Sequence, residues 1–278
     1  MAAAVAAAIP AVVVALAAAG KYTNARLNNR NMTDLLSTFA PITLDEMSGV
    51  KLMNRTDTKF VTNREKLRQL LLLAQHDYYV QEIDGERNLE YDTTYFDTRA
   101  FDMYNQHQWG HVNRQKMRFR TYCISGLQFM EVKTKNNHGR TKKKRIEVSD
   151  MNLSDQEKRL FLDKHLRYGI DTLQPALSNH FSRVTLVNKG KTERLTIDSS
   201  LCFHNLLNGQ ELDMGPLVII ELKRNGLVSS PVLEMLRQLR IHPHGFSKYC
   251  MGSALTNPQL PLNRFKCKLM EINKIVHQ

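Results

Sequence analysis

Three alternating basic and apolar stretches, joined by two turn sequences, decide the fold of this chain. Residues 115–148 read QKMRFRTYCISGLQFMEVKTKNNHGRTKKKRIEV. Alternation with a period of two is typical of β-strands with two unlike faces, and SG and NHG between such stretches are typical of hairpin turns. The predicted strands are Gln115–Cys123, Leu127–Lys135 and Arg140–Val148. We therefore expect a three-stranded antiparallel meander.

One face of this meander is strongly basic, because successive side chains of a strand point to opposite sides. Strand by strand, that face holds Lys116, Arg118 and Arg120, then Glu131 and Lys133, then Lys143 and Arg145. Like charges on neighbouring strands destabilise a sheet. The face therefore predicts a polyanionic ligand, with an ordinary solvated surface as the alternative. Arg118 and Arg120 are expected to repel each other when no ligand is bound.

The rest of the chain extends the sheet and surrounds it with helices. Further strands are predicted at Asn54–Thr62, Tyr78–Ile83, Leu89–Phe96, His180–Val187, Glu193–Asp198 and Leu217–Lys223. Helices are predicted at Thr33–Ala40, Thr43–Val50, from an Asn63 cap to about His76, and at Phe101–Trp109, Ser154–Tyr168, Pro231–Leu239, Ser247–Leu255 and Phe265–Val276. Meandering strands favour an α+β fold, an antiparallel eight-stranded β-barrel that forms a tunnel with peripheral helices.

Composition excludes several classes of protein. The 278 residues carry 39 Lys and Arg against 27 Asp and Glu, a formal net charge of +12, and 42% are hydrophobic. This is a globular composition, so a disordered or fibrous chain is excluded, and the charge predicts an anionic partner. The four cysteines form no CxxC pair. Reduced thiols in the cytoplasm are therefore expected, rather than a zinc or disulfide scaffold.

The chain begins with an Ala- and Val-rich segment without charge up to Gly20. Residues 1–32 are interpreted as an extension outside the fold, and residues 33–278 as one domain. A disordered extension, a weak membrane anchor and a signal sequence remain open for it, although no basic region precedes the apolar run. Membrane association through this segment is the alternative to a purely cytoplasmic protein.

Short motifs along residues 40–255 occur in the order of a known family. They are RTDTKF (55–60), YFD (95–97), RFRTY (118–122), FMEVKTK (129–135), KKR (143–145), FSR (181–183), RLTID (194–198), IELK (220–223) and FSKY (246–249). With these motifs the chain resembles the polyphosphate polymerase (VTC) domain of the triphosphate tunnel metalloenzyme, or CYTH-like, superfamily. The resemblance implies a tunnel that binds ATP and polyphosphate through basic walls.

Site residues follow from the same resemblance, position by position. It implies that Arg118, Arg120, Lys133, Arg183 and Lys248 act on the reacting phosphates. It further implies that Lys59, Lys143, Arg145, Arg194 and Ser247 bind substrate. Glu221 would bind a divalent metal, Mn²⁺ or Mg²⁺. Glu131 is a second candidate ligand, because a carboxylate among phosphate-binding cations suits such ions, and ion pairing with Lys133 or Arg120 is the alternative.

The predicted function is a metal-dependent polyphosphate polymerase, which transfers the γ-phosphoryl group of ATP to a growing chain. The hydrolase branches carry an ExExK-type motif on the first strand, whereas this chain has Arg55, Asp57 and Lys59 there. Three alternatives stay open: a triphosphatase of the same superfamily, a polyphosphate binder without catalysis, and a basic nucleic-acid-binding module. Nucleic acid is not the expected partner, because stacking aromatics are typical of such modules and Phe119 points away from the Arg118 face, although Tyr122 and Phe129 do not.

Overall fold

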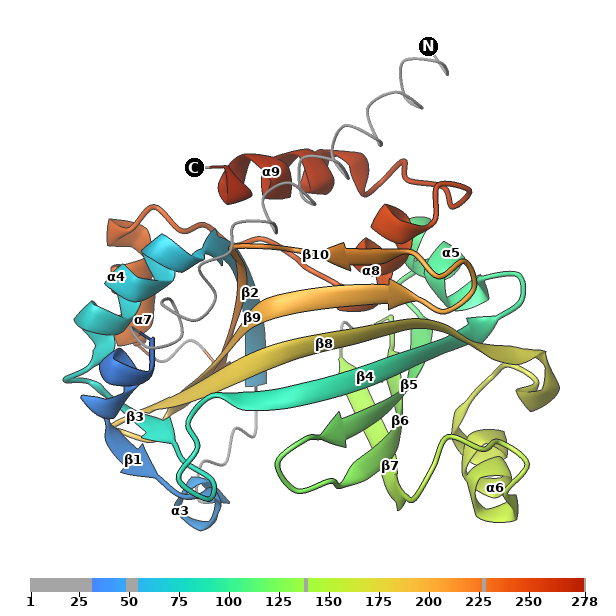
Figure 1. The fold of residues 1–278 in the computed structure, drawn as a ribbon, viewed down its shortest axis with the longest axis horizontal. Helices are drawn as coiled ribbons and strands as arrows, with labels where there is room; N and C mark the ends of the chain where they lie inside the picture. Colours follow the sequence, from blue (N-terminus) through green and yellow to red (C-terminus); the bar gives the residue numbers. More distant parts are fainter. Residues whose placement is uncertain (1–31, 49–54, 138–139, 227–228, 278) are drawn as a thin grey trace.

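A curled antiparallel sheet forms the body of the molecule (Figure 1). The computed structural model describes residues 32–48, 55–137, 140–226 and 229–277. Eight strands make up the main hydrogen-bonded path. In spatial order they are β2 (Arg55–Asn63), β11 (Leu217–Asn225), β9 (Glu193–Asn205), β8 (Leu173–Asn188), β4 (Leu89–Thr98), β5 (Arg114–Tyr122), β6 (Gln128–Lys135) and β7 (Thr141–Val148). The three predicted strands of residues 115–148 are confirmed as β5, β6 and β7.

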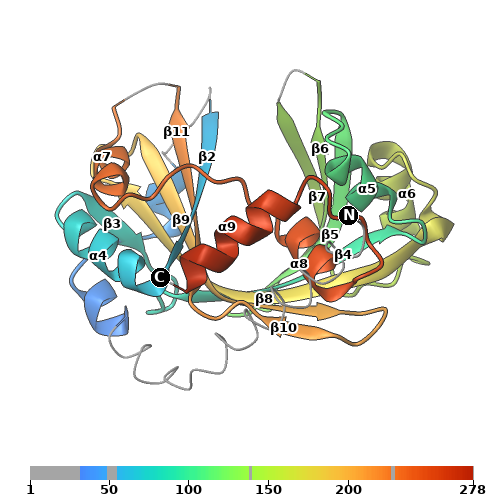
Figure 2. The same cartoon turned by 90° about the horizontal axis from the view of Figure 1, so that it is seen from above.

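The sheet curls until its two ends face each other, but it does not close. Seen from above, β2 and β11 rise on one side and β6 and β7 on the other (Figure 2). The α+β class and the eight-stranded antiparallel tunnel are confirmed in this curled form. β2 and β7 end the path, so the structure differs from a closed barrel. The free edge of β2 does not pair with β7. It contacts the loop that contains His244, whose N–H donates to the Lys59 carbonyl at 2.7 Å.

Three short strands complete the sheet. They are β1 (Ala40–Ile42), β3 (Tyr78–Gln81) and β10 (Glu211–Asp213). β1 pairs in parallel with β3, which in turn pairs with β8. The helix predicted to reach Ala40 therefore ends earlier, at residue 37, because Ala40 belongs to β1. Pairing with a strand far along the chain overrides local helix propensity here.

Two helices cover the outer side of β2, β11 and β9, namely α4 (Arg64–Ala74) and α7 (Pro231–Gln238). The Asn63 side chain accepts from the Lys66 N–H and caps α4 as predicted. Leucines at 67, 70 and 71 then fall on one helix face and are buried. They pack with Phe60 and Val218, so the outer face of this wall is apolar and its alternate residues point inward.

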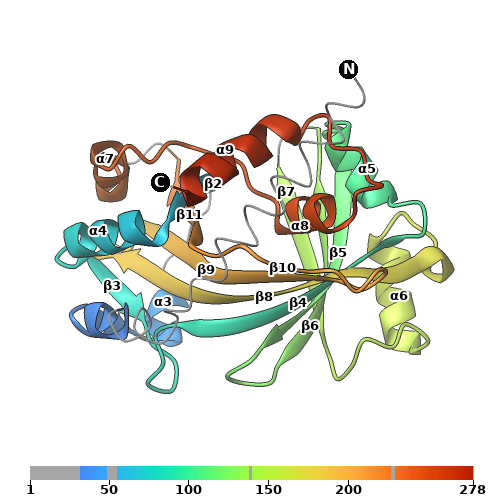
Figure 3. The ribbon, with the colours of Figure 1, turned by 45° about the horizontal axis from the view of Figure 1, so that its top comes forward.

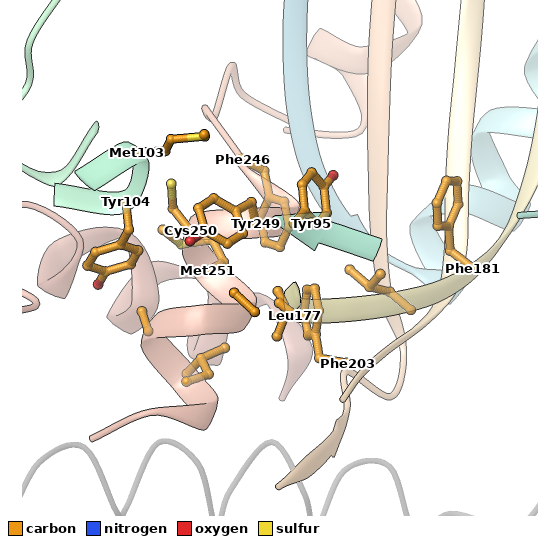
Figure 4. Close-up of a cluster of buried hydrophobic side chains, with 14 of the residues drawn as sticks. Tyr95, Met103, Tyr104, Leu177, Phe181, Phe203, Phe246, Tyr249, Cys250 and Met251 are labelled. Carbon is orange, nitrogen blue, oxygen red and sulfur yellow. The ribbon is translucent and has the colours of Figure 1, made fainter. Parts of the chain in front are cut away.

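Helix α8 (Lys248–Thr256) lies between the two walls of the sheet (Figure 3). Figure 4 shows its Tyr249 and Met251 among Tyr95, Leu177 and Phe203 from the strands beneath. A Cβ at Gly252 would lie 2.5 Å from the Phe203 ring. This close approach of helix to sheet therefore requires glycine.

The other helices lie at the ends and over the top of the sheet (Figures 1 and 3). They are α3 (Leu44–Ser48), α5 (Asp102–Gln108), α6 (Gln156–His165), the 3₁₀ turn η1 (Ile170–Thr172) and α9 (Lys266–Val276). None of the helices in the described ranges has the length and hydrophobicity that a bilayer crossing requires. Residues 1–31 of the predicted extension lie outside the described residues. So do Val50, the end of the helix predicted at Thr43–Val50, and Asn54, the start of the strand predicted at Asn54–Thr62.

Candidate functional site

The concave face of the curled sheet collects the predicted cations. On β5 and β6, Arg118 stands opposite Glu131, and Lys116 stands opposite Lys133. The Arg118 guanidinium contacts the Glu131 carboxylate at 2.6 Å, and Lys143 Nζ from β7 lies 2.8 Å from the same carboxylate. Glu131 is therefore held between two cations. Its side chain is 1% exposed.

The opposite wall repeats this arrangement around Glu221. Lys59 on β2 stands opposite Glu221 on β11, and their charged atoms are 3.1 Å apart. Lys223 Nζ lies 2.8 Å from the other Glu221 oxygen. Lys223 is itself opposite Arg194 on β9. Glu221 also lies between two cations, but it is more open than Glu131, with 16% of its side chain exposed.

A third carboxylate, Asp198, lies on the floor of the concave face. It accepts from Arg183 Nε at 2.6 Å and from Arg183 Nη2 at 2.8 Å, and it pairs with Lys248 from the start of α8. The Lys248 ammonium also lies 3.8 Å from the centre of the Phe181 ring. Asp198 was not predicted as a site residue, although it shares a strand face with Arg194.

Unlike the cations that hold Glu131, Glu221 and Asp198, Arg120 has no carboxylate partner among the described residues. Its Nε donates to Thr93 Oγ1 at 3.3 Å, and its guanidinium lies 5.7 Å from the Tyr91 ring centre. Arg120 is 8% exposed. Burial, together with the charges of Arg118 and Arg183, lowers its pKa to about 10. This buried guanidinium can therefore bind an anionic ligand of the concave face.

Electrostatic coupling shows that the two walls face one another. Burial and the charges of Arg118, Lys59 and Lys116 lower the pKa of Lys133 to about 8, and Glu221 on the far wall opposes that shift. Burial lowers the pKa of Lys248 to about 7, against the attraction of Asp198. Burial and neighbouring cations thus disfavour the charged form of both lysines, and the nearby carboxylates offset this only in part.

The pKa values of the carboxylates are lowered as well, which here favours the charged form. Burial disfavours the charged form of Glu131, but Arg118, Arg120 and Lys143 outweigh it and lower the pKa to about 2. Burial likewise opposes ionisation of Glu221, yet Lys223 and Lys59 hold its pKa well below the ordinary range. Both carboxylates are therefore ionised at any working pH.

The remaining predicted residues lie at the margins. Ser247 caps α8 by accepting from the Cys250 N–H, and it also accepts from Lys116 Nζ at 2.7 Å. Arg145 is exposed and its guanidinium lies 4.4 Å from the centre of the Phe129 ring, so it stacks rather than pairing with Glu131 opposite. Lys116 was not predicted as a site residue. Nor was Lys223, although alternation along each strand already places both on the basic face.

A divalent metal fits this face only together with a phosphate ligand. Within the described ranges, no three His, Cys, Asp or Glu side chains are grouped closely enough to hold an ion by themselves. Mg²⁺ and Mn²⁺ bind well through one or two carboxylates plus substrate phosphates. Glu221 suits that role better than Glu131, because it is ionised and more accessible, whereas Glu131 is enclosed by Arg118 and Lys143.

A family model described as the VTC domain matches residues 54–257. The chain belongs to the VTC domain family. The matched range runs from the start of β2 to the residue after α8, so it includes both walls of the concave face. The resemblance seen in the motifs is thereby confirmed. The predicted site residues Arg118, Glu131, Arg183, Glu221 and Lys248 all lie inside this range.

Solved structures match the chain at low similarity. A candidate adenylyl cyclase from Hippeastrum, reported to have a dominant triphosphatase activity, shares 13% identity with a TM-score of 0.45, covering 76% of this chain and 99% of that one. A candidate adenylate cyclase from Bacillus halodurans shares 17% identity with a TM-score of 0.44, covering 77% and 99%. A search of curated proteins gives no match. These scores are too low to carry over an activity.

Proposed function

We propose that this VTC domain is a metal-dependent polyphosphate polymerase. It transfers the γ-phosphoryl group of ATP to the end of a polyphosphate chain on the concave face. The observation that carries the proposal is the pattern of pairing there: Glu131, Asp198 and Glu221 are each held by two cations, while Arg120 has no carboxylate partner in the described ranges. A polyanion with many closely spaced charges satisfies such a face.

Phosphoryl transfer needs alignment and positive charge more than it needs a protein base. A terminal oxygen of the chain, already ionised, forms a bond to the γ-phosphorus. The bond from that phosphorus to the β–γ bridging oxygen breaks, and ADP leaves. Arg118, Arg120 and Lys133 on one wall, with Arg183 and Lys248 on the floor, neutralise the charge that spreads over the transferred group.

Glu221 is the residue that would hold the metal, with phosphate oxygens of the substrate as its other ligands. The metal would supply Lewis-acid neutralisation of phosphate charge. Lys59 and Lys223 each contact one of the two Glu221 oxygens. Both lysines can turn to phosphate when substrate arrives, which leaves the carboxylate open to a cation.

The test is to incubate the protein with ATP and Mn²⁺ and to separate the products by chain length. Wild type should produce long-chain polyphosphate. Glu221→Gln keeps size and hydrogen bonding but removes the charge, so synthesis should fall by about two orders of magnitude or more. Glu157→Gln, an exposed carboxylate on α6, is the matched control and should behave as wild type.

The products also separate the alternatives. Release of free phosphate without polymer would identify a triphosphatase and overturn the polymerase proposal. Tight binding of polyphosphate without either product would identify a binder. Near-normal synthesis by Glu221→Gln would remove Glu221 from the metal role and make Glu131 the preferred ligand.

A further inference from the structure

At one end of the sheet, β2 packs against both α4 and α9 (Figure 3). A cavity of about 380 Å³ with basic side chains in its lining lies at this edge. The lining residues that matter are Thr62, Lys66, Arg240, His244, Glu271 and Lys274. Val61 and Thr62, neighbours on β2 whose side chains point to opposite faces, both line the cavity, so it lies at the free edge of this strand. Lys59, Glu221 and Lys223 are not part of the lining, so the cavity is separate from the site on the concave face.

The charge of this cavity is positive. Lys66 comes from the first turns of α4, Arg240 from the loop after α7, and Lys274 from α9. Glu271 is the acidic side chain of the lining, and it lies 3.1 Å from His244 Nε2. Three separate elements thus bring their cations to one small volume, which predicts an anion as its ligand.

Two buried polar atoms of the lining lack a partner among the described residues. Thr62 is 1% exposed, and its Oγ1 makes no hydrogen bond there. His244 Nδ1 is likewise buried without a hydrogen-bond partner. Buried polar groups are nearly always satisfied, so each such atom calls for a ligand, an ion or water. A hydroxyl donor beside three cations matches phosphate oxygens.

We propose that this cavity binds a small phosphate-bearing anion, a phosphomonoester or free orthophosphate, independently of the concave face. Small-molecule sites commonly have volumes of about 300–1,000 Å³. The cavity therefore has room for a phosphate group and a small organic substituent. The ligand would also contact the loop whose His244 N–H donates to the Lys59 carbonyl.

Equilibrium dialysis of the full chain with labelled orthophosphate and, in a separate arm, glycerol phosphate tests the proposal. Lys66→Ala and Lys274→Ala should each weaken binding about tenfold, which corresponds to one lost charge-assisted contact. Lys164→Ala, an exposed lysine on α6, is the matched control and should bind as wild type. The tighter arm identifies which of the two ligand sources the cavity prefers.

Thr62→Val separates a binding role from a structural one. Valine has nearly the shape of threonine but no hydroxyl, so the empty protein should keep or raise its melting temperature while phosphate binding weakens several-fold. Unchanged binding in Thr62→Val, Lys66→Ala and Lys274→Ala would overturn the proposal, as would loss of all binding in Arg120→Met. Dialysis measures binding rather than turnover. Its result therefore tests this cavity even if the protein does not synthesise polyphosphate.

Discussion

Two arginines on one strand should respond in opposite directions to the same substitution. Arg118 and Arg120 are two residues apart on β5 and face the same side. Arg118 contacts Glu131 at 2.6 Å, whereas Arg120 has only Thr93 and aromatic rings. From the sequence, replacement of either is expected to preserve or raise stability. In the structure, Arg120→Met should still preserve or raise stability. Arg118→Met should lower it, because it removes the contact with Glu131.

The magnitudes follow from these contacts. Arg118→Met leaves the buried Glu131 with Lys143 in direct contact and with the charge of Arg120 nearby. The loss should be about 2 kcal/mol, below the 3–5 kcal/mol typical of a fully broken buried pair. Arg120→Met removes a guanidinium whose pKa is lowered to about 10. It therefore also removes the free-energy cost of keeping this buried group charged at neutral pH. The stem still packs on Tyr91, and a gain of about 1 kcal/mol is expected after loss of the Thr93 bond.

Unfolding in urea at pH 7 and low salt, without polyanion, measures both changes. In thermal unfolding, Arg118→Met should lower the midpoint by about 4–8 °C, and Arg120→Met should raise it by a few degrees. Tripolyphosphate should then raise the melting temperature of wild type more than that of either variant, since a ligand of the folded state stabilises it by mass action. If both substitutions destabilised the protein equally, the claim that Arg118 but not Arg120 is paired with Glu131 would be refuted.

Three further outcomes are expected. Tripolyphosphate affinity should fall by up to about tenfold per pH unit between pH 7 and 9, because the pKa of Lys248 is about 7 and binding requires the protonated amine. Calorimetric titrations at several pH values measure this dependence. Lys248→Arg should flatten it, because arginine stays charged over this range. Gly252→Ala should cost about 1–3 kcal/mol in urea unfolding, because its Cβ would lie 2.5 Å from Phe203. Asp97→Asn should cost about 2 kcal/mol by the same assay, because its carboxylate accepts from Tyr249 and from backbone N–H groups at the start of α5.

Side-chain alternation predicts the basic face well. It places Arg118 with Arg120, and Glu221 with Lys223, on shared strand faces, because alternation along a strand is fixed by geometry. Which cation holds which carboxylate depends instead on register between strands. The Arg183–Asp198 pair arises from the β8–β9 register, which is shifted by an irregularity between His180 and Ser182. A single sequence gives no direct measure of that shift.

Strand lengths are harder to predict. β8 begins at Leu173, seven residues before the predicted start at His180. Pro175 argues against a strand there, since proline cannot donate to the ladder. It stands opposite Phe96, beside a register shift between Tyr95 and Phe96, where the regular ladder is already interrupted. The openness of the sheet is not predicted either, because closure depends on how β2 and β7 meet across the whole fold.

Chemical labelling of lysines tests most directly whether the concave face binds a polyanion. Amines react with acetylating reagents when neutral, and Lys133, with a pKa of about 8, is partly neutral near that pH. Bound tripolyphosphate should cover this side chain and favour its proton, so its labelling should slow by about fivefold or more, while exposed Lys164 on α6 stays unchanged. Equal labelling of Lys133 with and without tripolyphosphate, at concentrations that saturate binding, would contradict the account.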